Sequence, residues 1–193
     1  MHTLSAAFIL GYHGCDATTA EKLLSGQDFK FSNNNYDWLG SGIYFWEANP
    51  KRGLEFAQEL AGLDRGPKIT DPAVVGAVVD LDFCLDLTTS AGLDQVNVAF
   101  QRLEKINEAS EKALPENNED GLRRNLDCAV IQMLHLIRDE KEMPPIDSVK
   151  GVFVEGDPVY CKSGFHHKTH IQICVCNPDC IKGVFRVPQR FLD

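Results

Sequence analysis

The sequence has little positive charge and no long apolar stretch. It contains 19 lysine and arginine residues against 28 aspartate and glutamate residues, which gives a formal net charge of −9. This balance argues against broad electrostatic adhesion to nucleic acid or to anionic membranes, but it is compatible with a local basic patch. No apolar run reaches the length needed to cross a bilayer, so we expect no membrane association.

The sequence also lacks a cysteine framework, internal repeats and low-complexity segments. Its seven cysteines are an odd number and lie within apolar runs, so we interpret them as reduced thiols. The apolar residues 4–10 are too few for a secretory signal, and no cationic region precedes them. These observations predict a cytoplasmic protein. Its 193 residues predict a single domain, residues 1–193.

Hydrophobic periodicity predicts a mixed α+β fold, with strands at both ends of the chain and helices gathered mainly between them. The expected strands and β-rich segments are 5–11, 43–46, 73–87, 149–154, 170–176 and 181–187. The expected helices are 18–26, which has a capping box and a glycine stop, 49–60, which opens on Asn-Pro, and the longer 93–113 and 122–137.

Three short motifs carry candidate chemistry, and the first is His13-Gly14. We place this pair at the end of the first strand, where a ring and nearby backbone amides can face a ligand. The alternative is a histidine that only packs against its neighbours.

The second motif is Gly40-Ser41-Gly42, followed by Tyr44. No third glycine follows and a strand comes next, so the pattern does not fit a dinucleotide-binding loop and predicts a tight turn. Alternation places Tyr44 on the strand face opposite to Ile43 and Phe45. The tyrosine ring then either packs in the core or stacks on a planar ligand.

The third motif is Gln172 in an apolar strand, where a glutamine must face water or be hydrogen-bonded. The loop before it is the most basic part of an acidic chain. Glu155 is the most prominent acid near this end of the chain. It either activates a nucleophilic acceptor group on another molecule or lies in a solvated turn.

Together the three motifs resemble the ADP-ribosyltransferase fold, in the branch of poly(ADP-ribose) polymerases and diphtheria toxin. That branch carries a His-Gly pair, a glycine-x-glycine-x-tyrosine-phenylalanine element and a late glutamate. Here they correspond to His13-Gly14, residues 40–45 and Gln172, where glutamine replaces the glutamate. The resemblance covers both ends of the chain and is weak over roughly residues 65–148.

The resemblance implies two small packed β-sheets that form an NAD cleft. His13 would bind the adenosine-side ribose, Gly14 would bind the nicotinamide amide through its backbone, and Tyr44 would stack on the nicotinamide ring. Phe56 would cover the other side of that ring, with Trp46 and Trp38 as weaker alternatives. Gly42 and Cys15 are the remaining residues expected to bind NAD. Cys15 stands where the family usually has a small hydroxyl residue.

The glutamine at position 172 determines which reaction we expect. An amide can hold a ribose hydroxyl, but it supplies no negative charge and no base. The resemblance therefore implies a mono-ADP-ribosyltransferase that moves one ADP-ribose from NAD to a nucleic acid or a protein. Such small enzymes are often bacterial toxins or anti-phage defence effectors, paired with a neutralising antitoxin. The alternatives are an NAD- or ADP-ribose-binding module without transfer activity and an NAD-hydrolysing toxin.

The loop before Gln172 takes the place of the family's acceptor-recognition loop. Its cationic and imidazole side chains are candidates for contact with a phosphate or an acidic surface: Lys162, His166, His167 and Lys168. A solvated loop is the alternative. Cysteines and histidines also gather near this end of the chain, but no C-x-x-C motif is present, and we expect no metal.

Overall fold

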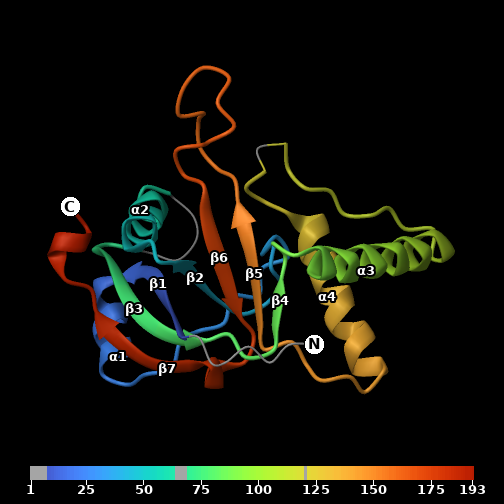
Figure 1. Cartoon of the computed structure of the whole chain (residues 1–193), viewed down its shortest axis with the longest axis horizontal. Coiled ribbons are helices and arrows are strands. Elements are labelled where there is room, and N and C mark those ends of the chain that lie inside the picture. The colour runs from blue at the N-terminus through green and yellow to red at the C-terminus, as the bar shows by residue number, and fades with distance from the viewer. Residues whose placement is uncertain (1–7, 64–68, 120) are drawn as a thin grey trace.

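The computed structural model describes residues 8–63, 69–119 and 121–193. It has a mixed α+β architecture with one seven-stranded sheet and four α-helices among these residues (Figure 1). The elements, in chain order, are β1 Phe8–Asp16, α1 Ala17–Leu24, β2 Ile43–Glu47, α2 Pro50–Ala61, β3 Pro72–Asp80, β4 Cys84–Asp86, α3 Ser90–Ala109, α4 Asn125–Glu140, β5 Ser148–Phe153, β6 His170–Val175 and β7 Ile181–Arg186, with short 3-10 turns at Pro178–Cys180 and Gln189–Phe191.

The strands form one hydrogen-bonded sheet, in the order β4-β5-β6-β2-β1-β3-β7, where two separate sheets were expected. The two halves of this sheet meet at β1 and β2, which pair only through Gly11 with Glu47 and Tyr12 with Trp46. By contrast, β1 pairs with β3 over nine residues. The expectation of two separate sheets was wrong, because this short ladder joins the two halves into one sheet. Only two residue pairs connect the halves there.

The helices lie on both faces of the sheet. Directly paired residues share a face, so Tyr12, Trp46, Gln172 and Gly151 lie on one side, here called the Trp46 face. The opposite side, called the Phe45 face, is covered by α1 and by residues before β2. Helix α2 covers the Trp46 face over β1 and β3, while α3 and α4 cover it over β4 to β6 (Figure 1).

Most of the expected elements are present with boundaries shifted by a few residues. The first strand is the main correction, because β1 continues to Asp16 and does not end at Gly11. Pairing with β3 along its whole length explains the extension. Residues 5–7 of the expected strand lie outside the described residues. Helix α3 ends at Ala109, four residues earlier than expected.

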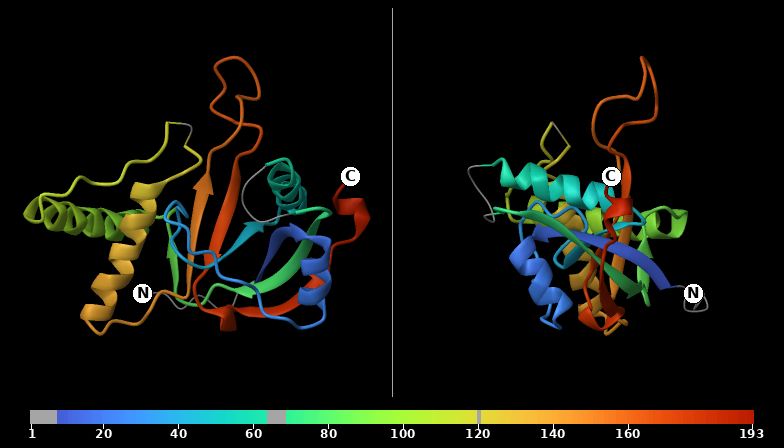
Figure 2. Two further views of the ribbon diagram at one scale, coloured as in Figure 1. Left: turned by 180° about the vertical axis from the view of Figure 1, so that it is seen from behind. Right: turned by 90° about the vertical axis from the view of Figure 1, so that its left-hand side faces the viewer.

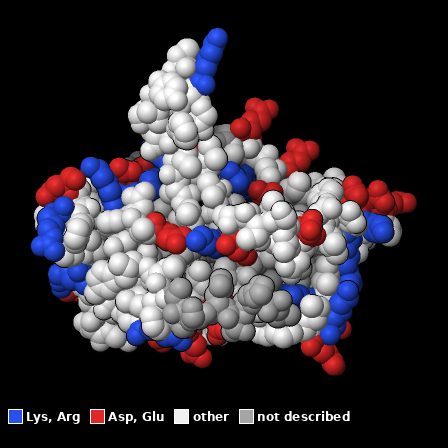
Figure 3. All heavy atoms as spheres, in the orientation of Figure 1, with Lys and Arg blue, Asp and Glu red and all other residues white. Residues whose placement is uncertain are grey.

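A hairpin arm, residues 154–169, extends β5 and β6 and stands away from the body (Figure 2). Backbone hydrogen bonds cross it at Val159–Phe165, His167–Asp157 and Lys168–Glu155, so the arm is an ordered extension of the hairpin. On the face of the arm that Figure 3 shows, charge is seen mainly near the tip, and Lys162 is the only lysine or arginine between residues 154 and 167.

Candidate functional site

The site predicted from the sequence centres on the place where β1 and β2 separate. Beyond Tyr12 the two strands are no longer paired, and the His13 side chain reaches across to the backbone of β2. Its Nδ1 lies 2.9 Å from the Tyr44 carbonyl oxygen. A carbonyl only accepts, so Nδ1 carries the proton and donates, which leaves Nε2 of the neutral ring as a hydrogen-bond acceptor.

The His13 ring packs on the Phe45 face of the sheet. Its centroid lies 5.3 Å from that of Phe29, in an edge arrangement, and 5.8 Å from that of Phe45. Burial lowers the pKa of His13 below its ordinary value, and the hydrogen bond to the Tyr44 carbonyl opposes this shift only in part. The ring is therefore neutral at pH 7.

Tyr44 lies on the other face, as strand alternation predicts, with its ring packed against the core cluster under α3 and α4. Its hydroxyl donates to the Gly40 carbonyl at 2.7 Å and accepts from the Leu39 amide at 3.1 Å. Burial raises the pKa of this phenol far above its usual range. Tyr44 thus fixes the turn that precedes its own strand, and only part of the ring is exposed.

Two of the expected glycines have no room for a side chain. A Cβ at Gly14 would lie 2.0 Å from the Gly53 carbonyl oxygen of α2, and one at Gly42 would lie 2.5 Å from Cys174 Sγ. Gly14 thereby lets α2 pack directly on β1, and Gly42 lets the turn approach β6. Gly14 shares the Trp46 face with Tyr44, whereas His13 does not.

Gln172 lies on the Trp46 face, on the strand next to that of Tyr44. Its Oε1 accepts a hydrogen bond from Trp38 Nε1 at 2.5 Å. The structure thus brings Tyr44, Gln172 and the Gly14 backbone to one face, and it adds Trp38 to them. No pattern in the sequence indicated this contact, because Trp38 and Gln172 are 134 residues apart.

Aromatic side chains form a continuous row across this face, from α2 to the segment before β2. Neighbouring ring centroids lie 4.8 to 6.1 Å apart, and the row runs Phe56, Trp46, His170, Phe153 and Trp38. Phe56 therefore contacts Trp46, not Tyr44.

Three buried nitrogens beside this row have no hydrogen-bond partner among the described residues: Trp46 Nε1, His170 Nε2 and Arg52 Nε. Buried polar atoms are nearly always paired, so the region has unused hydrogen-bonding capacity. Sequence reasoning missed His170 and Arg52. A histidine that opens an apolar strand is a weak signal, and nothing in the sequence marked the arginine.

Glu155 lies at the base of the arm and is bound by Arg52 of α2. Both of its carboxylate oxygens lie 2.9 Å from Arg52 Nη2. The same guanidinium contacts Glu59 at 3.3 Å, and Glu59 in turn contacts Lys168 Nζ at 2.8 Å. This chain of ion pairs ties the arm to α2. These contacts indicate that Glu155 stabilises the structure rather than activates an acceptor.

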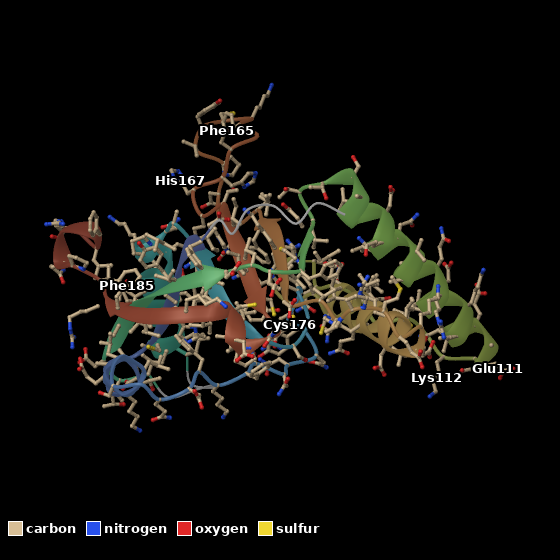
Figure 4. The ribbon with its side chains drawn as sticks, turned by 60° about the horizontal axis from the view of Figure 1, so that its bottom comes forward. Glu111, Lys112, Phe165, His167, Cys176 and Phe185 are labelled. Carbon is tan, nitrogen blue, oxygen red and sulfur yellow. The ribbon has the colours of Figure 1, made fainter. Side chains whose placement is uncertain are left out.

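The arm residues expected to bind an acceptor differ in availability. Lys168 is held by Glu59, and His166 donates through Nδ1 to the Gly156 carbonyl at 2.8 Å. His167 lies close to the base of the arm, while Phe165 lies near its outer end (Figure 4). Phe165 and Tyr160 expose 70% and 61% of their surface. The arm thus presents exposed aromatic rings to solvent. The sequence interpretation considered only its basic and imidazole residues and did not predict this feature.

Cys15 and the two hollows lie away from Tyr44 and Gln172. Cys15 is buried under α1 on the Phe45 face, and burial raises its pKa to about 11. One hollow of about 580 Å³ is lined by Glu59, Lys168 and their neighbours, and another of about 690 Å³ lies between α1, α2 and β7. Within the described part of the chain, no three His, Cys, Asp or Glu side chains form a metal-binding group.

The chain matches no protein-family model, no curated protein and no solved structure in the comparisons made. Among the described residues, no helix has both the length and the apolar composition required to span a bilayer.

Proposed function

We propose that the chain is a mono-ADP-ribosyltransferase that uses NAD as its co-substrate. One observation carries the proposal: Tyr44 and Gln172, which are 128 positions apart, lie on neighbouring strands and on one sheet face, beside the point where β1 and β2 separate. The nitrogens of Trp46, His170 and Arg52 beside the same face are buried and have no hydrogen-bond partner among the described residues, which supports a polar group bound near them.

In the proposed reaction the bond between nicotinamide and ribose breaks, and its electron pair leaves with neutral nicotinamide. The sugar acquires oxocarbenium character, and a nucleophilic atom of the acceptor bonds to its anomeric carbon and then loses a proton. Gln172 holds a ribose hydroxyl but supplies no charge and takes no proton. Transfer therefore stops at one ADP-ribose unit, and the acceptor provides its own nucleophile.

The acceptor is a macromolecule, a nucleic acid or a protein, that meets the arm. We place the protein among cytoplasmic toxins or anti-phage defence effectors, whose activity an antitoxin would neutralise. The exposed rings of Phe165 and Tyr160 favour an acceptor that offers stacking or apolar contacts.

The test is incubation with NAD labelled in its adenylate part, together with separate pools of RNA, DNA and protein. We expect nicotinamide release and a label of one unit on one pool. Long polymer would contradict the assignment, and release without labelling would identify an NAD hydrolase. The Tyr44→Ala variant tests the site, with Phe45→Leu on the opposite face as its control.

A binding module is the second candidate, and two observations favour it. The Tyr44 hydroxyl and Gln172 Oε1 are both engaged in internal hydrogen bonds, and the hollows described above lie elsewhere. Measurable NAD binding without nicotinamide release would support this candidate against the transferase.

A further inference from the structure

The indole of Trp38 lies over a position that only glycine allows. A Cβ at Gly151 of β5 would come within 2.6 Å of the Trp38 ring atom Cη2. Phe153 meets the ring edge-on with centroids 5.2 Å apart, and the Arg124 guanidinium carbon lies 5.0 Å from its centroid. Three neighbours thus fix the plane of the Trp38 ring.

Held in this way, Trp38 extends across β5 and reaches Gln172 on β6. An indole N–H donates and never accepts, so Gln172 must turn its carbonyl oxygen toward Trp38. The NH₂ group then points away from Trp38. Among the residues that the structure describes it has no hydrogen-bond partner, and the Gln172 side chain is partly exposed.

We propose that Trp38 is a positioning residue that fixes the amide orientation of Gln172, so that Gln172 presents N–H donors to the bound sugar. This inference rests on the proposed function, in which Gln172 contacts the ribose of NAD. The two ends of an amide have nearly the same shape and opposite hydrogen-bonding character. Without the indole N–H, a flipped Gln172 would present an acceptor in place of the donors.

The orientation decides which ligand atom is recognised. An N–H of this group donates to a lone pair of an oxygen, and a ribose hydroxyl provides such an oxygen beside the bond that breaks. A glutamate at this position would behave differently, because its two oxygens are equivalent. One oxygen would accept from Trp38 and the other would face the ligand as an acceptor, whichever way the group turned. A carboxylate therefore needs no orienting partner.

This difference gives a test that separates positioning from packing. Trp38→Phe keeps an aromatic ring at this position and removes the N–H donor, together with the part of the indole that lies over Gly151. That loss of packing is the same in the chain with Gln172 and in the Gln172→Glu background, so the difference between the two backgrounds reports the N–H donor. We expect kcat for nicotinamide release to fall about tenfold in the chain with Gln172, with little change in KM. In the Gln172→Glu background the same Trp38→Phe change should cost less than about twofold, because the carboxylate is symmetric.

The outcomes distinguish this inference from the proposed function. Equal losses in the two backgrounds, with the wild type active, would mean that Trp38 only packs, and would overturn the inference alone. A wild type that neither binds NAD nor releases nicotinamide would overturn the proposed function, and the role of Trp38 with it.

A spectroscopic measurement examines the contact directly. The chain has two tryptophans, so Trp38→Phe identifies the Trp38 indole signal in a proton–nitrogen NMR spectrum. We expect Gln172→Ala to shift the Trp38 signal more than the Trp46 signal, because only the Trp38 indole N–H donates to Gln172, although Trp46 pairs with residue 172 across the strands. A Trp38 signal that Gln172→Ala does not move would overturn the inference irrespective of activity.

Discussion

Arg52 holds Glu155 with both carboxylate oxygens 2.9 Å from one guanidinium nitrogen. Arg52 exposes only 4% of its surface, and it joins α2 to the base of the arm, which lies 103 residues later in the chain. A buried ion pair of this kind is costly to break, because removal of one partner leaves the other charge buried without compensation.

We therefore expect Glu155→Ala to lower the free energy of unfolding by about 3 kcal/mol, measured by urea denaturation. The exposed pair of Glu21 and Arg186 is the control, and Glu21→Ala should leave the unfolding midpoint unchanged. A catalytic Glu155 predicts the opposite pattern, with stability intact and nicotinamide release abolished.

The pH dependence of stability should reflect two histidines, His170, which is buried, and His13, which is partly buried. Burial lowers the pKa of His13 and of His170 below the ordinary 6.5, and hydrogen bonds to backbone carbonyls oppose the shift only in part. The folded state then binds fewer protons than the unfolded chain, so this contribution is complete above about pH 6.5 and is lost as the pH falls.

We expect the urea midpoint to decrease between pH 7.5 and pH 5. The decrease should be shallower in His13→Asn, because that variant lacks one of the two groups. An unchanged midpoint over this range in the wild type would show that both rings accept a proton without cost in the folded state.

The local elements were readable from the sequence, because each depends on neighbouring residues. Alternation placed Tyr44 opposite Phe45, and the Asn-Pro start of α2 was identified from its cap, where Asn49 Oδ1 accepts from the Arg52 amide. These features follow from periodicity and capping chemistry.

The rest depends on contacts between distant segments. The sequence did not reveal that a two-residue ladder between β1 and β2 joins the sheet into one. It did not reveal the burial of Arg52, because arginine is rarely buried unless it is paired, and its partner Glu155 lies far along the chain. The contact of Trp38 with Gln172 depends in turn on the absence of a side chain at Gly151.

The hydroxyl of Tyr44 gives a separate prediction, because it satisfies two backbone groups of the turn before β2. Tyr44→Phe removes both hydrogen bonds and leaves the ring, so we expect a loss of about 1 to 2 kcal/mol in the free energy of unfolding. Tyr36→Phe, at a tyrosine in the same segment, serves as the control and should be neutral. Equal losses in the two variants would mean that the turn does not depend on the Tyr44 hydroxyl.

The exposed rings of the arm give the last prediction. Phe165 and Tyr160 contact solvent with most of their surface and contribute little to the core, so their replacement by serine should not change the unfolding midpoint. If the arm meets the acceptor, the double variant should label the acceptor at least about tenfold less, because aromatic residues dominate the energy of such contacts. Val98→Ser on α3 replaces a similarly exposed apolar side chain outside the arm and should label normally. Normal labelling by the double variant would place acceptor recognition elsewhere, since the arm would then contribute neither to stability nor to the contact.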